Sequence, residues 1–265
     1  MAAKYILKQA GTKEEMNGIM DVIWAANYTP YEPFVQIFFP VTGIFPAERK
    51  AAIVESKARF WDLHQEDPSS NWFYVEEIGT GQPVGCAQWQ LFLENPFPTG
   101  PPKLQATWWP ETEDREFCEQ ILNQIYKPRA SWMTRPHLAL NWMAVIPTHR
   151  RLGVGSLLMQ HGIKRADSLS LECWLEASAM GRPLYEQFGF QSLFKIAFDT
   201  TRKNATDVWR KCEHEMTPAP FHAMWRPKQG VWEEEAEGEG KEVKMPWELG
   251  KGGKVELNGE VDQVW

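Results

Sequence analysis

The sequence has 265 residues, of which 43% are hydrophobic and 24% are charged, with 14 Trp and 14 Phe. This supply of apolar side chains can fill a sizeable core, so the composition excludes a wholly disordered chain. No stretch approaches the roughly 18 consecutive apolar residues of a membrane span, and the first residues lack the apolar region of a signal peptide. We therefore expect a soluble, cytoplasmic protein with no membrane partner.

The net charge of -7 is concentrated near the C-terminus. Residues 232–265 hold ten acidic and four basic side chains, whereas the rest of the chain holds 25 acidic and 24 basic ones. This nearly neutral part lacks the basic surface that nucleic acids require, so no nucleic-acid partner is expected. The four cysteines are scattered without a CxxC pair, which disfavours a disulfide framework and a metal site. We divide the chain into a domain over residues 1–228 and an acidic, Gly-rich tail over residues 229–265, which we expect to be a weakly ordered appendage.

The chain begins with a pattern typical of a strand followed by a helix. A short strand is predicted over residues 4–8 and an amphipathic helix over residues 13–27, because apolar residues recur there at helical spacing. Thr12 and Glu15 match a capping box at the start of this helix. Residues 28–46 hold four prolines among aromatic side chains, which excludes a long helix and indicates a packed segment.

A second helix and a hairpin are predicted next. The helix covers residues 47–64 and is expected to bury Ile53, Val54 and Trp61. Two strands then flank a Gly-rich turn and predict an antiparallel hairpin, with strands over residues 72–77 and 84–92. A long connection over residues 95–136 follows, with a helix predicted over residues 111–126.

The second half of the chain predicts a strand, a loop, a helix and another strand, which is the pattern of a parallel pair inside a mixed sheet. The expected strands cover residues 137–145, 171–176, 190–198 and 221–226. One expected helix begins after Gly155, and another covers residues 183–187.

The most informative segment runs from Val145 to Ser156. Gly153 and Gly155 remove side chains where the chain turns from a strand into a helix, which leaves backbone amides at the positive end of the helix dipole. Such amides bind anions, and a pyrophosphate suits them best. Arg150 and Arg151 would add positive charge at the rim. The alternative is that the glycines only allow the helix to begin. A dinucleotide-binding loop and a P-loop are both excluded, since neither GxGxxG nor a P-loop lysine is present.

Together, Arg150-x-x-Gly153-x-Gly155 and the later Leu184-Tyr185-Glu186-Gln187-Phe188-Gly189-Phe190 resemble the GNAT superfamily of acyl-CoA-dependent N-acetyltransferases. The resemblance spans roughly residues 4–226 and is most specific over residues 138–198. It implies an α/β fold with a mixed, mostly antiparallel sheet. This sheet would be splayed between its two central parallel strands and would carry helices on both faces.

The resemblance also implies that acetyl-CoA is the acyl donor and that no metal takes part. The pantetheine arm would pair with the backbone of Met143, Ala144 and Val145, and an amide of the same strand would polarise the acyl carbonyl. An amine would attack the thioester directly in a ternary complex, and Tyr185 would protonate the departing thiolate. The alternative for Tyr185 is a packing role. The residues implied to bind the pyrophosphate are Arg150, Arg151, Leu152, Gly153, Val154, Gly155 and Ser156.

A general base is less evident than the acid. Related enzymes place Glu or His roughly where this chain has Ala139 and Asn141, and neither of these can accept a proton. The nearest candidates are His137, Glu172 and Glu176, each more readily explained as structural. A water chain, or an acceptor that is already neutral such as an arylamine, would need no such base.

Acceptor specificity is expected from residues 28–46, 95–136 and 217–221, two of which are rich in aromatic residues and proline. They favour an apolar or aromatic small-molecule amine, although the same rings could simply pack long loops onto the domain. One alternative is transfer to a protein lysine or N-terminus. Another is a non-catalytic protein that binds acyl-CoA. No pattern in the sequence points to an oligomeric state.

Overall fold

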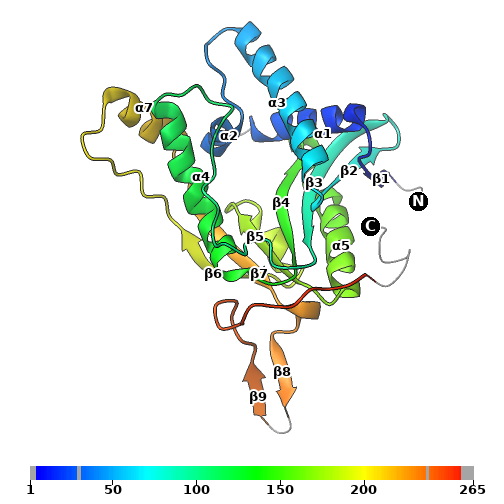
Figure 1. Ribbon diagram of the computed structural model, residues 1–265. Helices are drawn as coiled ribbons and strands as arrows, with labels where there is room; N and C mark the ends of the chain where they lie inside the picture. Colours follow the sequence, from blue (N-terminus) through cyan, green and yellow to red (C-terminus); the bar gives the residue numbers. More distant parts are fainter. Residues whose placement is uncertain (1–3, 29–30, 237–238, 258–265) are drawn as a thin grey trace.

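The computed structural model describes residues 4–28, 31–236 and 239–257 (Figure 1). A seven-stranded sheet has the order β1-β2-β3-β4-β5-β7-β6. Its neighbouring strands are antiparallel except for β4 and β5, which run parallel. The strands are β1 Tyr5–Gln9, β2 Ser70–Glu77, β3 Gln82–Phe92, β4 His137–Val145, β5 Glu172–Ala177, β6 Gln191–Ile196 and β7 Phe221–Arg226. The expected mixed, mostly antiparallel sheet is confirmed.

Helices cover both faces of this sheet (Figure 1). They are α1 Lys13–Asn27, α2 Pro33–Phe38, α3 Pro46–Glu66, α4 Glu113–Trp132, α5 Val154–Ser168, α6 Arg182–Glu186 and α7 Asp207–Met216. Successive strand residues point to opposite faces, so Trp72 and Tyr74 pack with α1, α3 and α4, whereas Phe73 and Val75 pack with α5. The first group of helices, with α2 and α7, forms one layer, and α5 and α6 form the other.

The start of α1 agrees with the sequence pattern. The Glu15 amide donates to Thr12 Oγ1 at 3.2 Å, and the Thr12 amide donates to Glu15 Oε2 at 3.0 Å, which confirms the capping box. For α3 the expectation about Val54 is wrong, because this side chain is 60% exposed. The helix faces α1 through Ser56, whose hydroxyl accepts a hydrogen bond from Trp24 Nε1 at 3.0 Å. Residues two positions apart in a helix point to nearly opposite sides, so Val54 faces solvent when Ser56 faces α1.

Two features of the C-terminal region differ from expectation. The sequence pattern did not predict α7, which begins at the N-cap Thr206 and buries Trp209, Cys212 and Met216. The tail was expected to be a weakly ordered appendage, but residues 244–257 contact the domain. Arg135 Nη1 donates to the Pro246 carbonyl at 3.2 Å, and the Val255 amide donates to the Leu93 carbonyl at 2.7 Å. Between α7 and this segment, β8 Glu233–Ala236 and β9 Glu239–Glu242 form a separate hairpin.

The sheet divides between β4 and β5. Their parallel ladder runs from His137–Glu172 to Leu140–Leu175 and stops there, although both strands continue. β4 stays paired with β3 as far as Val145, and the register shift between Gln88 and Trp89 leaves Asn141 as a bulged residue. The expected splay is therefore present, and it begins immediately after Leu140.

Candidate active site

The loop before α5 has the geometry of an anion site. Gly153 is the N-cap of α5 and has φ of 87°, a left-handed conformation that glycine adopts without the strain of a Cβ. The first amides of a helix have no intrahelical acceptor, and Gly153 has no side chain that could cap them. The amides of Val154, Gly155 and Ser156 are therefore available as donors at the positive end of a 15-residue helix.

The two arginines of this loop have different surroundings. Arg150 donates from Nε to the Val145 carbonyl at 3.1 Å and from Nη2 to the Ala26 carbonyl at 2.6 Å. It was expected at the rim of the anion site, but these bonds hold the loop against β4 and α1. Arg151 and Leu152 are exposed at the loop surface.

Close packing surrounds the start of α5. A Cβ added to Gly155 would lie 2.9 Å from Leu184 Cδ2 of α6, and one added to Gly85 would lie 2.5 Å from Val154 Cγ1. Both distances are far below an ordinary contact between carbon atoms. Packing therefore also explains the glycine at position 155, because the missing side chain lets α6 approach α5.

Met143, Ala144 and Val145 lie on the part of β4 that has separated from β5. They pair with Ala87, Cys86 and Gly85 of β3, respectively, on one side. On the β5 side the ladder has already ended at Leu140. A strand edge without a neighbouring strand can pair with an extended ligand through its backbone groups.

Tyr185 lies on α6, against the cluster formed with α5. It is 9% exposed, and its ring meets that of Phe190 edge-on at 6.4 Å. Burial raises the pKa of Tyr185 to about 12, so the phenol is protonated at neutral pH, as an exposed tyrosine also is, and is a weaker acid than an exposed one. A Cβ on Gly181 would lie 3.2 Å from the Tyr185 hydroxyl oxygen, so the absence of a side chain at Gly181 leaves room for that hydroxyl.

The opposite face of β4 is covered by aromatic rings. Trp142 is the centre of this group, and its ring lies 4.9 to 6.0 Å from those of Phe34, Phe38, Phe39 and Phe60. Phe34 also meets Phe221 of β7 at 5.0 Å. Segments far apart in the sequence therefore meet over the strand that would bind the acyl group.

Two of the three candidate bases lie at the paired end of β4 and β5. His137 is fully buried, its Nδ1 lies 2.7 Å from the Arg135 carbonyl oxygen, and burial lowers its pKa to about 3. Glu172 is paired with Arg135 and accepts a hydrogen bond from Trp225 Nε1 at 2.6 Å. Both side chains are thus buried and engaged at the paired end of the two strands.

The third candidate, Glu176, belongs to a network that the sequence analysis missed. Arg129 of α4 pairs with Glu176 and also reaches Asn141 Oδ1 at 3.4 Å. The Tyr126 hydroxyl donates to the same oxygen at 3.2 Å, and burial raises its pKa to about 12. One signal could have pointed to Arg129: it follows Ile125 by four residues, so it continues the apolar face of the helix beyond residue 126, where that helix was predicted to end.

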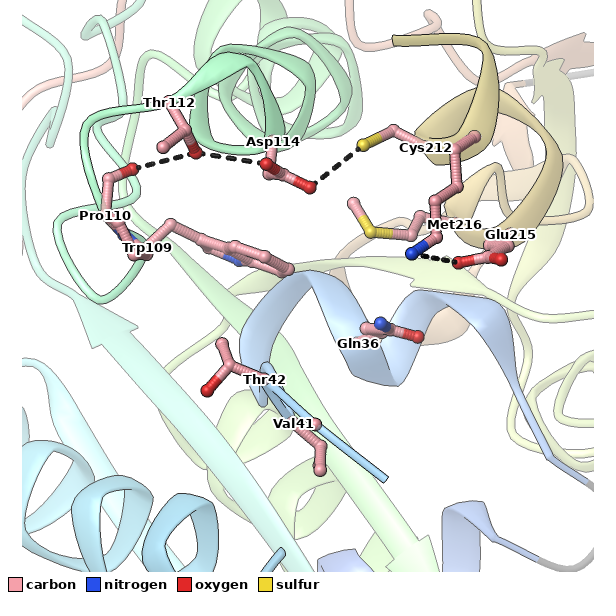
Figure 2. Close-up of a pocket in the computed structure, with 12 residues that line it drawn as sticks. Gln36, Val41, Thr42, Trp109, Pro110, Thr112, Asp114, Cys212, Glu215 and Met216 are labelled. Atoms are coloured by element: carbon pink, nitrogen blue, oxygen red, sulfur yellow. Dashed lines mark hydrogen bonds and ion pairs between the residues drawn. The ribbon is translucent and has the colours of Figure 1, made fainter. Parts of the chain in front are cut away.

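A cavity of about 270 Å³ lies outside the aromatic group, between α2, α7 and the start of α4 (Figure 2). Two carboxylates line it, and both have partners. Asp114 accepts hydrogen bonds from Cys212 and Thr112 at 3.3 and 3.1 Å, and Glu215 lies 4.0 Å from Lys211 Nζ. Gln36 of α2 also lines the cavity, whereas Phe34 and Phe38 of the same helix contact Trp142.

All four cysteines are free and buried. In residues 4–28, 31–236 and 239–257, no group of three or more His, Cys, Asp or Glu is arranged to hold a metal ion. Within the same described ranges, no helix is both long and apolar enough to cross a membrane.

Comparisons with known proteins agree with this architecture. A model of the acetyltransferase (GNAT) family matches residues 42–190, more than half of the chain. A crystal structure of histone acetyltransferase HPA2 and related acetyltransferase from Corynebacterium glutamicum is similar, with a TM-score of 0.50 and 21% identity over 85% of this chain and 97% of that one. A mosquito arylalkylamine N-acetyltransferase like 5b has a TM-score of 0.54 and 13% identity over 84% of this chain and 99% of that one. At these identities the two structures show a shared fold, and curated protein sequences gave no match. Because the family model covers the splayed strands and the glycine loop, the chain belongs to the GNAT family of acetyltransferases.

Proposed function

We propose that this enzyme transfers an acetyl group from acetyl-CoA to a primary amine of an aromatic small molecule. The observation that carries the proposal is the end of the β4–β5 ladder at Leu140, beside a helix capped by a left-handed glycine. In this proposal the loop Arg150–Ser156 binds the pyrophosphate, with the guanidinium of Arg151 beside it. The pantetheine arm pairs with Met143–Val145.

Acetyl-CoA supplies a thioester carbonyl carbon that an amine nitrogen can attack. A backbone amide of β4 stabilises the negative charge that develops on the carbonyl oxygen. The new carbon–nitrogen bond forms as the carbon–sulfur bond breaks, and the nitrogen loses a proton to water. The departing thiolate takes a proton from Tyr185, and the resulting tyrosinate regains one from the water that took up the proton of the nitrogen.

The aromatic rings over β4 support an aromatic acceptor. Trp142 is half-buried, next to Met143, and is flanked by Phe34 and Phe38. Aromatic pairs favour offset or edge-on geometry and add to the energy of burial, so an aryl group could replace one of these ring contacts.

The acceptor is further proposed to react as a neutral amine without a side-chain base. Glu176 is paired with Arg129, the pKa of His137 is lowered to about 3, and the pKa of Tyr126 is raised to about 12. His137 and Tyr126 would therefore not take a proton from an ammonium near pH 7, and the Glu176 carboxylate is engaged by Arg129. The rate with a weakly basic arylamine should then be flat between about pH 6 and pH 9. With an arylalkylamine, kcat/KM should rise with pH in proportion to the fraction of the amine that is neutral. An inflection at the same pH in the profiles of both amines would indicate a titrating group of the enzyme and would contradict the proposal.

The donor is tested by thermal unfolding with coenzyme A, acetyl-CoA and longer acyl-CoAs. A ligand at 100 times its Kd stabilises the folded state by about 2.7 kcal/mol, which should raise the Tm by several degrees. Amines, and peptides with a free N-terminus or lysine, are then screened for release of the coenzyme A thiol. The donor assignment fails if no acyl-CoA raises the Tm. A peptide that outperforms every small amine would favour a protein acceptor.

A further inference from the structure

The point where β4 and β5 separate is bridged by a side chain. Asn141 and Glu176 are the next positions after the last ladder pair, Leu140–Leu175. In an uninterrupted parallel ladder these two residues would be neighbours. Arg129 reaches both of them, from Nε to Glu176 Oε1 at 3.2 Å and from Nη1 to Asn141 Oδ1 at 3.4 Å. Its Nη2 also donates to Glu176 Oε2. The guanidinium thus connects the two strands where the backbone ladder stops.

This bridge is buried and its partners are held in place. The side chains of Arg129 and Glu176 are 3% and 6% exposed. Trp174 Nε1 donates to Glu176 Oε1 at 2.7 Å, and the Tyr126 hydroxyl donates to Asn141. Burying an ion pair costs about as much desolvation energy as the pair returns, so such a pair is weak evidence of a stabilising role. Its position suggests instead a role in defining geometry.

The bridge extends across the sheet through amide side chains. Asn141 Nδ2 donates to Gln88 Oε1 at 2.9 Å, and Gln88 Nε2 donates to Ser70 Oγ at 2.7 Å. These bonds hold Asn141 at the bulge of β4. A bulge redirects the residues that follow it, which here are Trp142 and Met143.

We propose that Arg129 is a positioning residue that sets the separation of β4 and β5 and thereby the direction of the β4 amide that polarises the acyl carbonyl. This inference rests on the proposed function, because it assumes that acetyl-CoA binds between these strands. Arginine suits the role since its planar guanidinium can donate to a carboxylate and an amide oxygen at once, whereas lysine presents a single point charge. Arg129 itself contacts neither donor nor acceptor in this proposal.

The test uses acetyl-CoA labelled with carbon-13 at the acyl carbonyl. Polarisation by the β4 amide should shift the carbonyl resonance of wild-type-bound acetyl-CoA away from its position in solution. In Arg129→Lys and Arg129→Met that shift should largely disappear. Acetyl-CoA affinity should change by no more than about threefold, since the anion loop is intact. With an amine substrate, kcat should fall by about 10- to 100-fold, because small misplacements of reacting groups have effects of this size.

A second buried ion pair, whose carboxylate also lies on β5, provides the matched control for the Arg129 variants. Arg135 and Glu172 are 8% and 2% exposed, and Glu172 lies on β5 four residues before Glu176. Arg135→Met should therefore lower the Tm as much as Arg129→Met does. At temperatures below its Tm, Arg135→Met should keep the wild-type carbonyl shift and kcat, because the β4–β5 ladder is intact at the end where Glu172 lies.

The results separate the two proposals. If the wild type does not bind acetyl-CoA, the proposed function and this inference both fail. If the wild type binds it with a shifted carbonyl, and Arg129→Met retains that shift and kcat, only the inference is overturned. Equal losses in the Arg129 and Arg135 variants would also overturn it, since they would reflect general destabilisation. If Arg129→Met does not fold, Glu176→Gln gives the same test by removing the charge with little change in shape.

Discussion

Gly153 offers the sharpest test of the anion loop, because a side chain can be added there without a steric clash. No heavy atom lies within 4 Å of a Cβ built on Gly153, although its φ of 87° is left-handed. Any L-residue would therefore lose about 1–2 kcal/mol of stability from the backbone conformation alone. Gly153→Gln and Gly153→Glu share this loss and have nearly the same shape. They differ in one negative charge beside the amides at the start of α5.

The charge should weaken acetyl-CoA binding by a predictable amount. Two unit charges about 6 Å apart interact by about 3 kcal/mol at an effective dielectric constant of 20. Because Gly153 is exposed, we halve this value for solvent screening, which leaves about 1.5 kcal/mol, or about tenfold in Kd. Titration calorimetry should therefore show Gly153→Glu binding acetyl-CoA about tenfold more weakly than Gly153→Gln. The ratio should shrink as salt is added.

The two Tm values should be nearly equal, which shows that the comparison measures binding and not folding. Equal affinities of Gly153→Glu and Gly153→Gln at low salt would refute the reasoning. In that case the glycine would serve only the turn into α5.

Three further outcomes follow from buried residues. Tyr185→Phe should lower kcat with little change in acetyl-CoA affinity, and wild-type turnover of this variant would leave Tyr185 with a packing role. Gly162→Ala should lower the Tm despite the higher helix propensity of alanine, because the added Cβ would lie 2.1 Å from Trp89 Cε2; a stabilised variant would contradict this, and Trp89→Phe should partly relieve the loss. The pKa of His137 is lowered from 6.5 to about 3, so the unfolded chain binds a proton that the folded chain does not. The unfolding free energy that neutral His137 contributes above about pH 6.5 is therefore lost as the pH falls below that value, by about 1.4 kcal/mol per pH unit. His137→Asn should show a smaller loss of unfolding free energy between about pH 7 and pH 5 than the wild type, and an equal loss would exclude His137 as the group responsible.

Local patterns in the sequence predicted most elements, because local forces decide them. The capping box at Thr12 located the start of α1, and the strand from His137 to Val145 was predicted with its observed bounds. α7 was missed, although Thr206 and the spacing of Trp209, Cys212 and Met216 mark it. Val54 was assigned to the wrong face of α3, because the periodicity of that helix is weak and its contact with α1 decides which side is buried.

The glycine loop and Tyr185 were recognisable from the sequence, since an anion loop is built from consecutive residues and needs no distant partner. Their assignment as site residues stays a prediction. The sequence could not show that Arg150 would bond to the Val145 and Ala26 carbonyls, because one of these acceptors is distant in the chain.

By itself, the sequence determined the order of the strands of the main sheet and the motif that identifies the family, because both are set by neighbouring residues. Only the tertiary structure decided which side chains meet around β4. Arg129, Asn141 and Glu176 lie on α4, β4 and β5, and Phe34, Trp142 and Phe221 lie on α2, β4 and β7. A buried ion pair or a ring contact exists only when the fold excludes water and brings both partners together. No spacing rule connects residues so far apart along the chain.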